Sequence, residues 1–404
     1  MQVVAGGHTL DVMRHRLARL LVALAIAAPL LVVPVPASSV PAPRSFTIAA
    51  AGDVLIHRRI AQVAHAGGGA YDFSNMFSEI SPWIEEADLA ICHLEVTLSP
   101  TNTGLQFYPR FVAPHEVADA IAGAGYDTCS TASNHSLDRG WPGVTDTLDL
   151  LDAAGVRHDG TARTPEERLP GLYDVAGVKV AHLSYTYGTN GLPIPEDHPY
   201  AVNVIDVDAI LADAAWARDA GAEFVIVSLQ WGLEYVVGPT GTQAAQADAL
   251  LASPHVDLIF GSHAHVVQPI GEIDGKFVVY GMGNQLSNQN SASGPKYYAT
   301  EDGLLVRVHV TEESPGEFAV ERIDIVPTWV RRSDYVIFPA RQAAEDTRTA
   351  YLMRASLERT VERVHRLDAP GIRLAPMSAP GRPCHCLLTP WDGLARRDLA
   401  PLVD

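Results

Sequence analysis

The alternation of strand-like and helix-like segments is the feature that most limits what this chain can fold into. Short apolar runs of strand length recur along the sequence, at residues 46–51, 89–95, 128–132, 178–185, 224–229, 258–260 and 277–280. Segments with apolar residues at helical spacing lie between them, at residues 116–123, 143–154, 207–220 and 243–252. This alternation is typical of an α/β fold.

The last part of the chain departs from this alternation. Residues 303–310 and 318–326 are apolar runs separated by Glu-Glu-Ser-Pro-Gly, which predicts a β-hairpin and therefore a partly antiparallel sheet. Residues 341–366 have the charged, amphipathic pattern of a helix, and the Pro- and Arg-rich stretch that follows predicts a loose tail. We expect one domain at residues 45–335, with a C-terminal helix and tail at residues 336–404.

Residues 1–44 have the pattern of a targeting segment and linker. A basic run at residues 14–19 precedes an apolar stretch at residues 20–33, and small residues suited to signal cleavage follow. We interpret this segment as an export signal, with an uncleaved membrane anchor as the alternative. Since the basic run follows Met13 directly, synthesis starts at either Met1 or Met13. The protein is then expected outside the cell or on the outer face of the cytoplasmic membrane, with membrane association through this segment left open.

Charge and cysteine content exclude some classes of function. The formal net charge of −18 argues against a nucleic-acid partner, because phosphate backbones are bound by clustered Lys and Arg. It does not exclude a phosphate held by metal ions. Four cysteines are few for an exported chain of 404 residues, so no disulfide framework is expected. Cys92 and Cys129 are interpreted as small buried hydrophobic residues.

Polar side chains follow the predicted strands where each strand ends. These positions are Asp53, Glu95, Asn134, Gln230, His263 and His265. The ends of strands in an α/β sheet line the ligand crevice, so we expect the six positions to lie close together. The carboxylates, the amide and the paired imidazoles of His263-Ala-His265 suit Mn, Fe, Zn or Mg. Taken singly, Asp53 and Asn134 could be turn or cap residues, but the set together predicts a metal site that acts on phosphorus.

These stretches also resemble a known family. Residues 51–55, 88–95, 132–140, 230–235, 261–269 and 280–284 are similar, in the same order, to the CapA-type capsule or poly-γ-glutamate synthesis proteins. The domain of that family is similar to calcineurin-like metallophosphoesterases. The resemblance implies a four-layer α/β/β/α sandwich with mixed sheets and a site for two divalent metal ions at one edge.

The resemblance also implies a role for each residue of the site. The ligands would be Asp53, Glu95, Asn134, His263 and His265, with Glu95 as the bridge, and His135 would be the acid or transition-state stabiliser beside the phosphoryl group. Gln230 departs from the family, which usually has His before Trp-Gly. Glutamine can bind a metal only through a neutral oxygen, so a second metal is predicted to bind more weakly.

Three functions remain open on the sequence alone. The first is an exported metal-dependent hydrolase or transferase that handles an anionic envelope polymer, such as poly-γ-glutamate, or a small phosphoester. The second is a non-catalytic envelope protein that binds or anchors such a polymer, and the third is a plain envelope phosphatase or nucleotidase. The net charge would repel a long polyanion from most of the surface, which favours a small or short-chain substrate.

Overall fold

The computed structural model describes residues 42–342 and 346–376. Residues 1–41, which contain the expected export signal, and residues 377–404, which belong to the expected tail, lie outside these ranges. Within the two described ranges, no helix has both the length and the apolar character needed to cross a membrane.

Two large β-sheets form the centre of the domain. The strands of the first sheet are β1 (Ser45–Val54), β4 (Leu89–Leu94), β7 (Thr128–Ser130), β8 (Arg157–Asp159), β15 (Asn284–Leu286), β16 (Asp302–Ser314), β17 (Glu317–Val330), β18 (Ile337–Pro339) and β19 (Ile372–Leu374). The strands of the second are β9 (Gly171–Val175), β10 (Val178–Thr186), β11 (Phe224–Gln230), β12 (Leu258–Ser262), β13 (Ile270–Ile273) and β14 (Lys276–Val279). Two small sheets pair β2 (His65–Gly67) with β3 (Ala70–Tyr71), and β5 (Thr97–Ser99) with β6 (Val112–Pro114).

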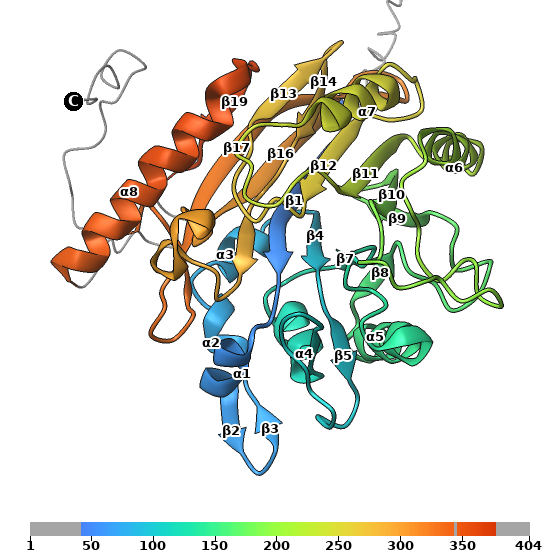
Figure 1. Ribbon diagram of the computed structural model, residues 1–404. Helices are drawn as coiled ribbons and strands as arrows, with labels where there is room; N and C mark the ends of the chain where they lie inside the picture. The colour runs from blue at the N-terminus through green and yellow to red at the C-terminus, as the bar shows by residue number, and fades with distance from the viewer. Residues whose placement is uncertain (1–41, 343–345, 377–404) are drawn as a thin grey trace, which may run out of the picture. The chain divides into compact units, whose positions relative to one another are not determined.

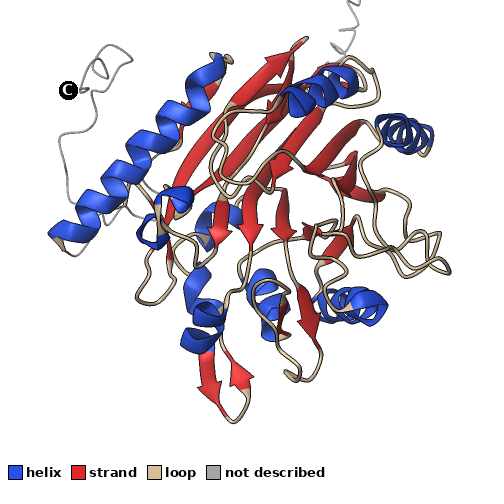
Figure 2. Ribbon diagram, viewed as in Figure 1, coloured by secondary structure: helices blue, strands red, loops and turns tan. Residues whose placement is uncertain are grey.

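The helices lie outside the sheets (Figures 1 and 2). They are α1 (Arg58–Ala64), α2 (Ser74–Phe77), α3 (Ser81–Ile84), α4 (Glu116–Gly123), α5 (Gly140–Ala154), α6 (Val207–Asp219), α7 (Gly241–Leu251) and α8 (Thr347–Val364). Three 3₁₀ turns, η1 (Ser291–Ser293), η2 (Pro295–Tyr297) and η3 (His365–Leu367), complete the described elements. Each of the seven predicted strand runs and four predicted helical segments coincides with one of these elements, and the predicted hairpin is β16–β17.

Alternating residues of β1 explain why four layers form. Ala49 and Ala51 belong to a core that the first sheet shares with α1 to α5, whereas Phe46 and Ile48 belong to a core between the two sheets. A third core lies between the second sheet and helices α6 and α7. Since successive side chains of a strand point to opposite faces, one apolar strand can serve two cores. The predicted α/β/β/α sandwich with mixed sheets is confirmed.

The order of the strands brings the ends of β1 and β4 to the middle of the first sheet. This sheet runs β18-β17-β16-β1-β4-β7-β8, with β15 paired to β1 and β19 paired to β17. β1, β4, β7 and β8 are parallel, whereas β16 and β17 are antiparallel. The second sheet runs β13-β14-β12-β11-β10-β9, with β10, β11 and β12 parallel.

The C-terminal elements belong to the first sheet. β18 and β19 both pair with β17, and α8 packs against β16 and β17. Arg359 of α8 forms an ion pair of 2.8 Å with Asp302, which is fully buried. The expected domain boundary after residue 335 therefore falls inside this sheet. β17 pairs with β16, which precedes the boundary, and with β18 and β19, which follow it.

The expectation that the cysteines form no disulfide framework is wrong for Cys92 and Cys129. The two residues are cross-strand partners in β4 and β7, and they form a disulfide with a Cα–Cα distance of 4.4 Å. Both are buried, as expected. The pairing was missed because it depends on the register of two strands that are 37 residues apart in sequence.

Removing this disulfide is expected to lower the free energy of unfolding by about 3–4 kcal/mol, because a cross-link over 37 residues restricts the unfolded chain. The measurement is urea denaturation of Cys92→Ala/Cys129→Ala beside the wild type, each with and without reductant. Reductant should weaken the wild type and leave the double variant unchanged. A wild type that is insensitive to full reduction would contradict this prediction.

Candidate metal centre

Asp53 lies near the end of β1, between two neighbouring strands. Its register partners are His93 of β4 and Asn284 of β15. A Cβ atom on the preceding residue, Gly52, would lie 1.9 Å from the carbonyl oxygen of Gly283, so only glycine permits β15 to approach this closely. The backbone N–H of Asp53 donates to that same oxygen at 2.9 Å. The Ala-Gly-Asp sequence thus fixes the position of the Asp53 carboxylate.

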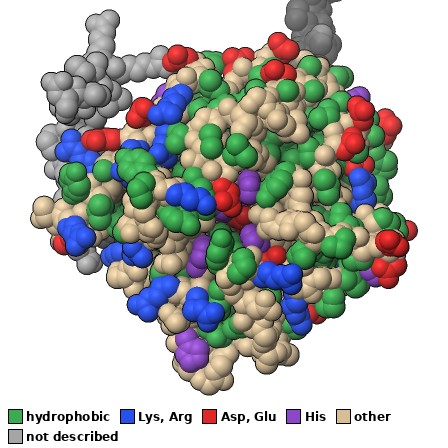
Figure 3. Space-filling view, viewed as in Figure 1, with side chains coloured by type: hydrophobic (Ala, Val, Ile, Leu, Met, Phe, Trp, Pro, Cys, Tyr) green, Lys and Arg blue, Asp and Glu red, His purple; other side chains and the backbone are tan. Residues whose placement is uncertain are grey.

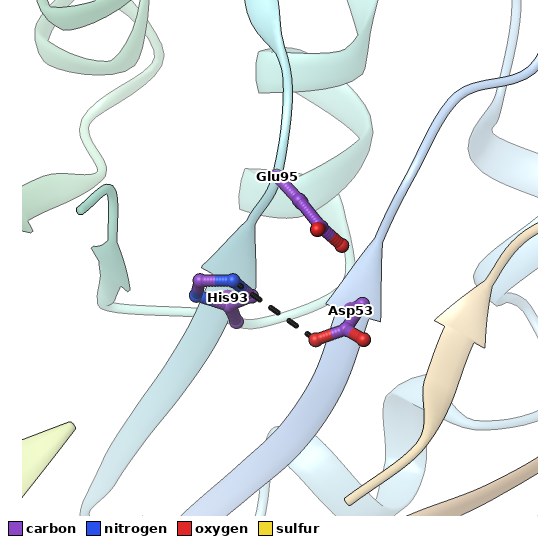
Figure 4. A group of neighbouring side chains, drawn as sticks. All are labelled: Asp53, His93 and Glu95. Atoms are coloured by element: carbon purple, nitrogen blue, oxygen red, sulfur yellow. Dashed lines mark ion pairs between the residues drawn. The ribbon is translucent and has the colours of Figure 1, made fainter. Parts of the chain in front are cut away.

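Asp53, His93 and Glu95 form a compact group of three buried side chains (Figure 4). Nε2 of His93 lies 3.9 Å from Oδ1 of Asp53, and the ligand atoms of all three residues lie within 4.8 Å of one another. His93 was absent from the predicted ligands. The alternation of a strand could have found it, because residues two apart share a face and His93 and Glu95 are two apart.

The two histidines after β12 complete one side of the group. Nδ1 of His265 lies 2.9 Å from Oδ2 of Asp53 and 3.8 Å from Oε2 of Glu95. The backbone N–H of His263 donates to Oδ1 of Asp53 at 3.3 Å. Both histidines have positive φ angles, 90° and 55°, in a region that non-glycine residues rarely adopt. Such strained backbone persists where the surrounding structure enforces it, which is common at functional sites.

Asn284 is a further member of this group, and it lies beside His265. Its Oδ1 lies 3.0 Å from Nδ1 of His265, and its Nδ2 donates to the carbonyl oxygens of His265 and Thr300. The side chain is fully buried. Asn284 therefore helps to hold the His265 ring against Asp53.

Gln230 and Asn134 form the opposite side. Oε1 of Gln230 accepts from the backbone N–H of Asn134 at 2.8 Å and from Oγ1 of Thr186 at 2.7 Å. Because a backbone N–H can only donate, it fixes the orientation of this amide. Nε2 of Gln230 then donates to Oδ1 of Asn134 at 2.8 Å and to Oε1 of Glu95 at 3.1 Å. All six predicted positions are thus brought together, and their role as ligands stays a prediction.

His135 is held beside this group by Asp138. Oδ2 of Asp138 accepts from Nδ1 of His135 at 2.6 Å and from the backbone N–H of Phe111 at 2.5 Å. A carboxylate at Nδ1 places a proton there and leaves Nε2 as the free end of the ring. Asp138 therefore orients His135. It does not cap α5, whose N-cap position is Arg139 and has no side-chain capping bond.

Burial and neighbouring charges set the protonation of the group. Burial raises the pKa of the Glu95 carboxyl well above its usual value, and the nearby Asp53 carboxylate adds to this increase. Burial lowers the pKa of His93 to about 4 and that of His263 to about 3. Burial also opposes the charging of His265, but Glu95 and the hydrogen bond to Asp53 outweigh it and raise its pKa to about 9. His93 and His263 are thus neutral, the form in which an imidazole binds a metal, whereas His265 would have to release a proton on binding one.

Three nitrogen and oxygen atoms of this group that could bind a metal are buried without a hydrogen-bond partner among the described residues. They are Nε2 of His93, Oε2 of Glu95 and Nδ1 of His263. A buried polar atom without a partner costs about 1–3 kcal/mol, so native structures rarely leave one unexplained. A divalent cation would satisfy such atoms, and the mixture of carboxylate oxygen and neutral imidazole nitrogen suits Mn, Fe or Zn. The residues present therefore fit a metal site.

A family comparison agrees with this geometry. The model of the bacterial capsule synthesis protein PGA_cap matches residues 47–289, which include every residue of the candidate metal centre described above. The chain belongs to this family. It is 25% identical to the capsule biosynthesis protein CapA of Bacillus anthracis over 290 residues, covering 70% of this chain and 66% of that protein. It is also 25% identical to the PGA biosynthesis protein CapA of Bacillus subtilis over 282 residues, covering 68% of this chain and 70% of that protein.

Solved structures similar to this PGA_cap family member include two phosphoesterases. The calcineurin-like phosphoesterase YfkN of Bacillus subtilis aligns with a TM-score of 0.44 at 14% identity, covering 80% of this chain and 100% of that chain. The 5′-nucleotidase precursor of Thermus thermophilus aligns with a TM-score of 0.45 at 14% identity, covering 79% of this chain and 59% of that chain.

Proposed function

We propose that this chain is a metal-dependent phosphoester hydrolase of capsule synthesis that works outside the cytoplasm. The observation that carries the proposal is the set of unsatisfied buried ligand atoms on His93, Glu95 and His263 around the Asp53 carboxylate. The names of its relatives, which refer to capsule and PGA biosynthesis, support a substrate linked to an anionic envelope polymer.

Two divalent cations are proposed, with unequal affinity. Asp53, His93 and His265 would hold the first, Asn134 and His263 the second, and Glu95 lies between the two groups. The amide of Gln230 already hydrogen-bonds both Glu95 and Asn134. Since a second cation would compete with these bonds, it is the weaker of the two.

The residues around the centre would divide the chemistry between them. A divalent cation in such a site acts as a Lewis acid that stabilises negative charge on a phosphoryl group. His135 would donate a proton from Nε2 to the oxygen of the leaving group when both of its ring nitrogens carry a proton, while Asp138 accepts from Nδ1 and orients the ring. The burial of Asp53, Glu95 and His265 excludes bulk water and strengthens every charge interaction in the site.

The disulfide supports the proposed location. Cys92–Cys129 is buried in the first sheet, and structural disulfides are rare in reducing compartments. An exported chain that folds in an oxidising compartment accounts for it, in agreement with the basic and apolar pattern of residues 14–33.

The proposal is tested on the purified chain by metal analysis, metal titration and a panel of phosphoesters. We expect bound Mn, Fe or Zn, two titration steps of different affinity, and turnover that is lost with chelator and restored by added metal. Protein that takes up no metal under reconstitution and hydrolyses no phosphoester would overturn the proposal.

One observation favours a second candidate, a non-catalytic envelope protein that binds an anionic polymer. The hydrogen bonds of Gln230 satisfy part of the centre without any cation. A pull-down with immobilised poly-γ-glutamate separates the two, comparing the wild type with Asp53→Ala. Equal retention together with absent turnover would favour the binding protein.

A further inference from the structure

A pocket of about 270 Å³ opens beside the candidate metal centre. Its lining includes Arg58 and Arg59 at the start of α1, Phe107 and Tyr108 from the segment between β5 and β6, and Asn288 after β15. No carboxylate contributes to the lining. In a chain with 47 acidic and 29 basic residues, this is a locally basic surface on an acidic protein.

Aromatic contacts connect this pocket to the proposed proton donor. His57 lines the pocket, and its ring packs edge-on against Phe111 with 5.2 Å between the ring centroids. Phe111 packs in the same manner against His135 at 4.8 Å. His57 also follows Asp53 by only four residues along the chain. The pocket therefore lies one aromatic ring, that of Phe111, away from His135.

The arginines of the pocket lack the carboxylate partners that other arginines of this chain have. Arg163, for example, forms ion pairs with Asp149, Asp152 and Glu167. Across residues 42–342 and 346–376, neither Arg58 nor Arg59 has an ion-pair partner, and the guanidinium of Arg58 lies over the Phe107 ring at 5.0 Å. Figure 3 shows His and acidic side chains gathered in the middle of one face, with Lys and Arg side chains beside them. Two adjacent positive charges left uncompensated in a pocket favour an anionic ligand.

We propose that this pocket binds a carboxylate-bearing segment of the substrate, next to the group that reacts at the metal centre. The inference rests on the proposed function and adds a specificity site to it. Guanidinium groups bind carboxylates through two parallel hydrogen bonds, and the exposed Tyr108 and the Phe107 ring can cover the methylene groups between successive carboxylates. A chain of glutamate-like acids has this chemistry.

The size of the pocket limits the length of the bound segment. Its volume lies below the usual range of about 300–1,000 Å³ for drug-sized ligands. Only a short segment fits, which agrees with the repulsion of a long polyanion by the remaining acidic surface.

The test measures the affinity of the metal-loaded full chain for a fluorescently labelled, short γ-linked glutamate oligomer by fluorescence anisotropy. The variant Arg58→Gln/Arg59→Gln is expected to bind the oligomer at least about tenfold more weakly than the wild type, because charge-assisted hydrogen bonds are lost. The matched control, Arg348→Gln/Arg366→Gln, removes the same two charges from exposed positions of α8 and η3. It should bind within about twofold of the wild type, since neither Arg348 nor Arg366 lines the pocket. Melting temperature and metal content establish that both variants fold.

Three outcomes would overturn the inference. They are equal affinity of the pocket variant and the wild type, an equal loss in the control variant, and displacement of the oligomer by inorganic phosphate as readily as by unlabelled oligomer. The last would identify the ligand as phosphate instead of carboxylate. Binding that depends on Arg58 and Arg59 in a wild type without phosphoester turnover would support the pocket and reject only the proposed hydrolase.

Discussion

Asp53→Ala is expected to abolish metal binding and phosphoester turnover together. Its carboxylate accepts from the His263 backbone, contacts His265 at 2.9 Å and lies 3.9 Å from His93. No other carboxylate reaches all three of these residues, within the part of the chain that the structure describes. We expect metal content to fall to that of chelator-treated protein, and kcat/KM to fall by at least about 10³-fold, equivalent to about 4 kcal/mol of transition-state stabilisation.

The measurements are elemental analysis of the purified variant and hydrolysis of the best phosphoester of the wild type. Asp88→Ala is the matched control, because Asp88 is an exposed carboxylate beside the start of β4 that bonds Thr47 of β1. It should retain metal and activity. A folded Asp53→Ala variant with the metal content of the wild type would show that the centre lies elsewhere.

His263→Ala tests the same centre through a neutral ligand. Its Nδ1 is one of the three unsatisfied buried atoms, and its pKa near 3 keeps the ring uncharged at neutral pH. Metal content and turnover are both expected to fall, and retention of both would exclude His263 as a ligand. Since the His263 backbone also supports Asp53, thermal denaturation of the variant checks that the loop has not collapsed.

The fold and most of the centre could be predicted because both depend on local sequence pattern. Apolar runs of strand length gave the strands, and polar residues at strand ends marked where a crevice would form. The position of Asp53 and of the His263–His265 pair at strand ends predicted that they would lie close together, and the structure has them in contact. Side chains that share one strand face, such as His93 beside Glu95, could also have been found from the two-residue period.

Other features depend on register, which local pattern does not encode. The Cys92–Cys129 bond requires the pairing of β4 with β7. The contact of Asn284 with His265 requires the short strand β15. The Gly-Met-Gly residues that precede this strand do not have the apolar pattern of a strand. The orientation of the Gln230 amide is set by the backbone N–H of Asn134, a contact across 96 residues. Such long-range constraints appear only when the sheets are assembled.

His135→Gln is expected to lower kcat by about 10²–10⁴-fold while metal content stays at that of the wild type, because the variant loses a proton donor and no metal ligand. A glutamine retains the size and a hydrogen-bond donor but cannot transfer a proton at neutral pH. The measurement is kcat and KM for a single phosphoester, with elemental analysis of the same preparation. Loss of metal in this variant would make His135 a structural support of Asn134 and not a proton donor.

A comparison of two leaving groups distinguishes the two roles that His135 could have, proton donor or positioning residue. An alkyl phosphate releases a poor leaving group that needs a proton, whereas 4-nitrophenyl phosphate releases a good one that needs little help. If His135 donates the proton, His135→Gln should lose more activity on the alkyl ester than on the nitrophenyl ester. Asp138→Asn should show the same preference in weaker form, because it leaves the His135 ring in place and removes the negative charge beside its Nδ1. Equal losses on both esters would contradict proton donation, since only the proton-transfer step depends on the basicity of the departing oxygen.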